Sequence, residues 1–208
     1  MNLESLKPEL EAAIPGCRLE IISNPSPSGQ HSLLISPEHA LDLATFLRDA
    51  PHLRFDYCSN VTGVDWPASA LPGKAKPREM EDGTEHDVDE EGEVQATGYL
   101  EAVYHLYSME RKHGPVILRM RTENRDTRVH LPSLTPIWRS ADFQEREIFD
   151  LFGIIFDGHP DLRRILMWDE FTDHPMRRDY VEPDDYEYEP TAHDDVLRKT
   201  MHHYSGNA

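Results

Sequence analysis

Hydrophobic residues in the first part of the chain recur with the spacing of two helices. In residues 3–14, leucine or isoleucine occupies every third or fourth position, which is typical of a helix with one buried stripe. Residues 40–47 repeat this pattern. Ser36 stands at the expected N-cap of that second helix and Pro37 at its first position, where a missing N–H costs nothing. Pro51 is expected to follow the end of the helix.

The remaining hydrophobic segments have the two-residue alternation of strands. Residues 18–23 and 31–35 predict a hairpin, and Leu53, Phe55 and Tyr57 predict a further strand. Residues 97–109 and 116–121 predict a second, longer antiparallel hairpin with one wet face. This order of elements predicts an α+β fold, with a small mixed or antiparallel sheet and helices packed on one side.

The negative charge of the chain is concentrated in two segments. The 208 residues contain 21 Lys plus Arg and 39 Asp plus Glu, a formal charge of −18. Many of the acidic residues lie in 79–93 and 179–195, which contain no Lys or Arg, and the remainder is close to neutral. A nucleic-acid surface is not expected, because phosphate contacts need an excess of basic residues. Residues 67–96, rich in Pro, Gly and acid, predict a disordered, solvated insertion. Binding of a basic partner is the alternative.

Several classes of protein are excluded by what the sequence lacks. No apolar run reaches the roughly 18–20 residues that span a bilayer, and residues 1–16 have no apolar core of a secretory signal. Cys17 and Cys58 are the only cysteines, so a reducing compartment is expected and a four-cysteine cluster is excluded. The dinucleotide, nucleophile-elbow and H-E-x-x-H motifs are absent.

A charged helix is predicted near residues 140–152, with Ser140 as N-cap and Gly153 as C-terminal stop. Its charges lie among large apolar residues, where charged groups are tolerated when they are paired. The candidate site residues of this helix and the following segment are Glu145, Arg146, Glu147, Asp150, His159, Arg163, Arg164, His174, Arg177 and Arg178.

Each group of candidates has alternative interpretations. The helix charges are expected to form an internal ion-pair network with Arg163 or Arg164, and contact with a partner or catalysis are the alternatives. Two of the carboxylates are spaced to share a divalent ion, but no third ligand is evident. The four arginines after the helix are expected to contact a partner rather than solvent. His159 and His174 precede prolines and are expected to fix turns rather than bind a metal.

The same segment resembles a known family. Its charged helix reads Glu-Arg-Glu-x-x-Asp-Leu-Phe from Glu145, with His159, Arg163 and Ile165-Leu166 at fixed spacing after it. This pattern resembles the signature of the 30 kDa subunit (also named the C subunit) of respiratory complex I, the proton-translocating NADH:quinone oxidoreductase. Residues 132–138 and 174–180 resemble flanking segments of that family, although Asp173, Met176 and Arg178 depart from its usual residues.

The resemblance implies a non-catalytic structural subunit of the peripheral arm, with no catalytic residue, cofactor or metal of its own. Iron–sulfur clusters, FMN, NADH and quinone are then expected in partner subunits. The chain is expected to brace the quinone-site (49 kDa type) subunit and the terminal-cluster subunit. It is expected to be peripheral, on the cytoplasmic side of the bacterial inner membrane. Residues 1–153 are expected to fold as a domain, and residues 154–208 to form an extended partner-binding arm with an acidic tail.

Two other functions stay open at the level of sequence. The first is the equivalent subunit of a related membrane-bound energy-converting hydrogenase or dehydrogenase. The second is a stand-alone metal-dependent hydrolase, whose ligands would come from scattered residues such as His105, His130 and His159.

Overall fold

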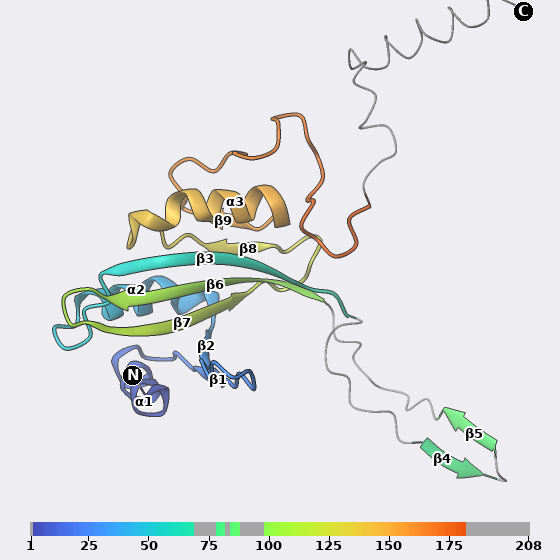
Figure 1. Ribbon diagram of the computed structural model, residues 1–208, viewed down its shortest axis with the longest axis horizontal. Helices are drawn as coiled ribbons and strands as arrows, with labels where there is room; N and C mark the ends of the chain where they lie inside the picture. The colour runs from blue at the N-terminus through green and yellow to red at the C-terminus, as the bar shows by residue number, and fades with distance from the viewer. Residues whose placement is uncertain (1, 69–77, 82–83, 88–97, 182–208) are drawn as a thin grey trace, which may run out of the picture. The chain divides into compact units, whose positions relative to one another are not determined.

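The computed structural model describes residues 2–68, 78–81, 84–87 and 98–181 (Figure 1). The chain divides into two units, Met1–Arg178 and Asp179–Ala208, and nearly all of the second unit lies outside the described residues. The elements of the first unit, in chain order, are α1 (Leu3–Ala13), β1 (Glu20–Ile22), β2 (Ser32–Ile35), η1 (Pro37–His39), α2 (Ala40–Asp49), β3 (Tyr57–Trp66), β4 (Arg78–Glu81), β5 (Thr84–Asp87), β6 (Tyr99–Ser108), β7 (His113–Arg121), β8 (His130–Pro132), η3 (Arg139–Ala141), α3 (Asp142–Phe152) and β9 (Ile155–Asp157).

Five strands form a mixed sheet in the order β1-β2-β7-β6-β3. Strands β2 and β7 are parallel, and the other neighbours are antiparallel. The side chains that alternate onto one face of β6, from Leu100 to Leu106, are fully buried. They belong to one core cluster with the apolar stripes of α1, α2 and α3. The α+β fold with a mixed sheet is therefore confirmed.

Helix α3 packs closely on the core face of the sheet. A Cβ added to Gly63 of β3 would lie 2.6 Å from the ring of Phe152, so the helix approaches the strand where the strand has no side chain. Tyr104 of β6 reaches the same helix through its hydroxyl group. In Figure 1, α2 lies behind β6 and β7. The helices thus cover the face of the sheet that holds the apolar core.

The opposite face of β6 is not the wet surface expected from the alternation. Glu101 is fully buried there and Val103 is 8% exposed. Glu101 is bonded by neighbouring side chains of the sheet itself, which is a contact that the sequence pattern does not reveal.

Two local predictions were wrong, and a third was right in position alone. Leu53 and Phe55 are buried but precede the strand, which begins at Tyr57, and the Phe55 N–H donates to the Leu47 carbonyl at 2.9 Å. Ser36 does stand at an N-cap position, directly before Pro37, but of the 3-10 helix η1, and its hydroxyl donates to Glu38 instead of accepting a capping N–H. Ser140 likewise donates to the Cys58 carbonyl at 2.8 Å rather than capping α3.

The predicted insertion at residues 67–96 contains an antiparallel pair, β4 and β5, that the sequence pattern does not predict. Most of the rest of that insertion lies outside the described residues. At the other end of the domain, the compact unit extends past the expected boundary at Gly153 to Arg178. Strand β9 pairs with β8, and Ile154 and Phe156 are part of the core. Residues 154–178 are therefore built into the domain rather than forming a separate arm.

Candidate functional site

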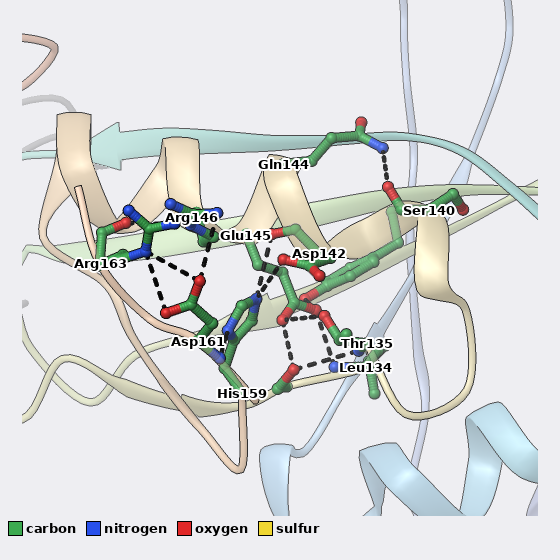
Figure 2. A network of polar contacts seen from close by, with 12 residues as sticks. Leu134, Thr135, Ser140, Asp142, Gln144, Glu145, Arg146, His159, Asp161 and Arg163 are labelled. Carbon is green, nitrogen blue, oxygen red and sulfur yellow. Dashed lines mark hydrogen bonds and ion pairs between the residues drawn. The ribbon is translucent and has the colours of Figure 1, made fainter. Parts of the chain in front are cut away.

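Helix α3 is the element around which the predicted site residues gather, and Figure 2 shows four of them, Glu145, Arg146, His159 and Arg163. It follows η3 directly, and it ends at Gly153, which adopts a left-handed conformation with φ of +80°. The Gly153 N–H donates to the Phe149 carbonyl, so the predicted C-terminal stop is confirmed. Four residues of the helix are buried: Glu145, Arg146, Ile148 and Asp150. Three of them carry charge: Glu145 binds the loop after β8, while Arg146 and Asp150 bind adjoining residues of the segment after β9.

Glu145 binds the loop that follows β8. Its carboxylate is fully buried and accepts hydrogen bonds from Ser133 Oγ at 2.5 Å, Leu134 N at 2.8 Å, Thr135 Oγ1 at 3.1 Å and Tyr104 Oη at 3.0 Å. In Figure 2 it points from the helix toward this loop. Burial raises the pKa of Glu145, and the four hydrogen bonds oppose that rise. The expected ion pair with Arg163 or Arg164 is wrong for this residue, since hydroxyl and backbone groups surround it.

Arg146 binds the turn that follows β9. Its Nε donates to the Arg163 carbonyl at 3.2 Å, and its Nη1 lies 3.7 Å from Asp161 Oδ2. The Arg163 side chain is largely exposed and bonds the same carboxylate at 2.9 Å. Phe143 stacks beneath the Arg146 guanidinium, 5.4 Å from ring centroid to Cζ. Arg146 thus bonds the segment after β9, and Asp150, one helical turn along, bonds the adjoining residues of that segment.

Asp150 binds the segment that runs back over the end of α3. Its Oδ1 accepts from Arg164 Nη1 at 2.6 Å, and its Oδ2 accepts from three consecutive backbone N–H groups, those of Ile165, Leu166 and Met167. Burial alone would raise the pKa of Asp150, but these hydrogen bonds outweigh it and hold the pKa below its ordinary value. The predicted internal ion pair is confirmed for Asp150 and Arg164.

Both predicted histidines bind the backbone near the ends of α3. His159 Nε2 lies 3.1 Å from the Asp142 carbonyl, and its Nδ1 accepts from the Asp161 N–H at 3.1 Å, which assigns the neutral tautomer with the proton on Nε2. His174 Nδ1 donates to the Asp150 carbonyl at 3.1 Å. Burial lowers the pKa of His174, so its ring is held neutral. Both rings fix turns, as the sequence predicted.

The other candidates differ in exposure. Arg177 Nε donates to the Phe152 carbonyl at 2.7 Å, where a cation also complements the negative end of the helix dipole. The backbone N–H of Arg178 donates to Asp65 at 2.8 Å, while Arg178 itself is exposed. Glu147 is exposed on the outer side of α3. Arg163, Arg178 and Glu147 are thus the candidates whose side chains stay accessible at the surface.

The buried charged residues of α3 hold the loop after β8 and the segment after β9 against the helix. The buried carboxylates of α3 have their lone pairs filled by donors of this chain, and within residues 2–68, 78–81, 84–87 and 98–181 no three His, Cys, Asp or Glu side chains converge to hold a metal. Sequence reasoning missed the partners Tyr104, Ser133 and Thr135. A buried tyrosine and hydroxyl residues facing a charged helix become recognisable only when the fold is known.

Comparison with known proteins identifies the family. A family model described as the respiratory-chain NADH dehydrogenase 30 kDa subunit matches residues 33–186. The chain belongs to this family. The NADH-quinone oxidoreductase C subunit of Roseiflexus castenholzii is 35% identical over 170 residues, covering 82% of this chain and 79% of the relative. The corresponding protein of Burkholderia multivorans is 37% identical over 179 residues, covering 86% and 76%. Family members are subunits of an enzyme complex, NADH-quinone oxidoreductase.

A solved structure has the same fold at lower identity. A chain of the membrane-bound sulfane sulfur reductase, described as an archaeal respiratory membrane complex, superposes with a TM-score of 0.57 and 17% identity. The match covers 94% of this 30 kDa-type chain and 91% of the other. Across the described part of this family member, none of the helices is long and apolar enough to cross a bilayer.

Proposed function

We propose that this chain is a non-catalytic structural subunit of the peripheral arm of a proton-translocating NADH:quinone oxidoreductase. In this role it braces the subunits that carry the terminal iron–sulfur cluster and the quinone site, chiefly the quinone-site subunit of the 49 kDa type. Its place is the cytoplasmic side of a bacterial inner membrane, as a peripheral component.

The observation that carries this proposal is the use of the charged residues of α3. Glu145 and Asp150 are both fully buried, and each carboxylate accepts four hydrogen bonds from the chain itself. A general acid or base must reach the proton that it moves, within hydrogen-bond distance or through one water. Carboxylates bonded in this way serve to hold segments together, and a rigid domain is what a bracing subunit supplies.

No cofactor is proposed for this chain itself. Both cysteines are buried and free, and two cysteines do not complete the four-cysteine set of an iron–sulfur cluster. Iron–sulfur clusters, FMN, NADH and quinone are assigned to the partner subunits. The exposed Arg163 and Arg178 are proposed to contact these partners, because a guanidinium fork binds carboxylates in bidentate fashion.

The proposal is tested by removing the chain from the complex that contains it. Membranes that lack it should still oxidise NADH with an artificial acceptor, through the flavin subunit, and should lose quinone reduction. Restoring the full-length chain should restore quinone reduction. The purified chain should contain no flavin or iron and should not oxidise NADH. Turnover or a redox centre in the purified chain would contradict the proposal.

The fold alone supports a second candidate function, in which the chain belongs to a different membrane-bound complex. The likeness to a chain of an archaeal respiratory membrane complex favours the equivalent role in a related energy-converting hydrogenase or dehydrogenase. Purification through a tag on this chain separates the two, because co-purified flavin and NADH oxidation indicate the first assembly and a nickel–iron centre indicates the second. Among the described residues nothing favours a stand-alone metal hydrolase, since His130 bonds Asp157 at 2.9 Å and His159 bonds backbone.

A further inference from the structure

The face of the five-stranded sheet turned away from its core carries aromatic residues and arginines. We propose that this open face, defined by Trp66, Tyr99, Glu101, Val103, Arg119 and Arg121, docks a partner protein through a surface rich in carboxylates. The inference goes beyond the proposed bracing role, because it assigns an interface on the sheet face that α3 does not touch. It rests on the proposed function only in taking the partner to be a subunit of the same complex.

The strand register brings these residues together. Trp66 of β3 lies opposite Tyr99 of β6, while Val103 and Glu101 of β6 lie opposite Arg119 and Arg121 of β7. Directly opposed residues of antiparallel strands point to the same face. The residues that alternate with them on β6, Leu100 and Ala102, point into the core.

A network of charges and rings holds this face in one arrangement. Glu101 is fully buried and accepts from Trp66 Nε1 at 3.1 Å, from Arg121 Nε at 2.9 Å and from the guanidinium of Arg119. The Arg121 guanidinium also stacks over Tyr99, 4.7 Å from the ring centroid. Long polar side chains that are fixed before binding lose less entropy when a partner arrives.

The charged residues at one end of the open face indicate which kind of partner surface would bind there. At one end of the open face a cleft of about 370 Å³ is lined by Arg18, Glu20, Leu34 and Arg121 among others. With Arg119 and Glu101, this region holds three arginines and two glutamates, although the whole chain carries −18. An excess of guanidinium donors on an acidic protein favours a partner surface that presents carboxylates.

The residue types on the open face are those that are common at the centre of protein–protein interfaces. Trp, Tyr and Arg are the residues most enriched where binding energy is concentrated. A sheet face exposed only to water has polar residues at alternate positions, whereas this face also carries the apolar Val103 and Ile117 beside half-buried aromatic rings. A second copy of this chain is disfavoured as the occupant, because this face placed against its own copy would bring arginines against arginines.

A pair of charge variants tests this proposal in the full-length chain. Thr62 is exposed on the edge strand β3, directly opposite Val103, so its side chain borders the open face. Thr62→Glu and Thr62→Lys are similar in size and opposite in sign. In competition with the wild-type chain for incorporation into the complex, Thr62→Glu should be incorporated about tenfold less than Thr62→Lys. Equal incorporation of the two variants, with equal thermal midpoints, would overturn the proposal.

A photo-crosslinking amino acid at position 62 gives a second readout that needs no change of charge. In the assembled complex it should join this chain to another polypeptide of the complex, and the same group at Leu41, which is 42% exposed on α2, measures background. A cross-link only to a second copy of this chain, or none above background, would overturn the proposal. If even the wild-type chain does not enter the complex, the proposed function fails instead.

Discussion

The Asp150 carboxylate and the Arg164 guanidinium form a direct ion pair, with Oδ1 and Nη1 separated by 2.6 Å. The second oxygen of Asp150 receives the N–H groups of the next three residues after Arg164, at 2.7 to 3.0 Å. One side chain of α3 thus fixes four consecutive residues of the segment that follows β9. This contact makes the segment part of the domain, although it contains little regular secondary structure.

Replacing Asp150 by alanine should destabilise the domain strongly. The change leaves a guanidinium that is 12% exposed and three backbone N–H groups without their acceptor. We expect a loss of about 3–5 kcal/mol in the free energy of unfolding, measured by urea denaturation of the purified chain. Glu147→Ala is the matched control on the same helix, because Glu147 is exposed, and it should change stability by less than about 0.5 kcal/mol. Equal losses in the two variants would contradict the role given to Asp150.

Replacing Glu145 by glutamine should destabilise the protein much less than replacing it by alanine. In Glu145→Gln, the amide oxygen can still accept from Leu134 N and Tyr104 Oη, and the amide group can donate to the hydroxyls of Ser133 and Thr135. Alanine leaves those groups buried without a partner, so Glu145→Ala should cost at least about 2 kcal/mol more than Glu145→Gln. Urea denaturation measures the difference, and similar losses in both would contradict this geometry.

The same glutamine variant isolates the pH dependence that Glu145 contributes. Because burial raises the pKa of Glu145 in the fold, the native state binds its proton more readily than the unfolded state. The wild type should therefore gain stability relative to Glu145→Gln as the pH falls through the raised pKa toward the ordinary value of about 4.5. Unfolding free energies of both proteins, measured in parallel from pH 7 downward, test the sign. A relative loss on acidification would contradict it.

Gly153 should be less replaceable than Gly158, although both adopt nearly the same backbone conformation. Their φ angles are +80° and +82°, so alanine carries a similar backbone strain at either position, of about 1–2 kcal/mol. A Cβ at Gly153 would also lie 2.4 Å from His174 Nε2, whereas nothing lies within 4 Å of one at Gly158. Gly153→Ala should therefore lower the thermal midpoint more than Gly158→Ala. An equal decrease would show that His174 is not held against the helix end.

The thiols should be unreactive in the native protein. Burial, reinforced by the charge of Glu145, raises the pKa of Cys58 to about 12, and burial also raises the pKa of Cys17. The thiolate is the form that reacts with alkylating agents. Mass spectrometry after iodoacetamide treatment should find no label on the native chain and two labels after denaturation. Labelling of Cys58 without unfolding would contradict its burial.

The general arrangement of the domain could be predicted from sequence, because strong periodicities report which side of an element is buried. The apolar stripes of α1 and α2 and the alternation in β6 and β7 are all found in the core. The hydrogen bonds of the hydroxyl groups could not be predicted at Ser36 and Ser140, although Ser36 does stand at the N-cap position of η1. Each hydroxyl has a nearby competing acceptor, the side chain of Glu38 or the Cys58 carbonyl.

The site was predicted as a set of residues but not as a set of contacts. Helical spacing places Arg146 and Asp150 within reach of each other, yet they are bonded to Arg163 and Arg164, adjacent residues of a segment that follows β9. The expected boundary at Gly153 was wrong for a related reason. Asp150 binds backbone N–H groups after Arg164. Because nearly every residue has such a group, the sequence does not show which of them a side chain will bind.

The most direct test of the structural role of α3 is the turnover of complexes that contain Glu145→Gln. This variant keeps the shape of the side chain and removes its ability to transfer a proton. The measurement is the rate of NADH-driven quinone reduction per assembled complex, with the amount of assembled complex determined separately. A purely structural role predicts a rate within about twofold of the wild type, since no acid–base step is assigned to Glu145, whereas general acid–base catalysis contributes about 10²–10⁴-fold. A normal amount of complex with turnover reduced by about a hundredfold or more would contradict that role.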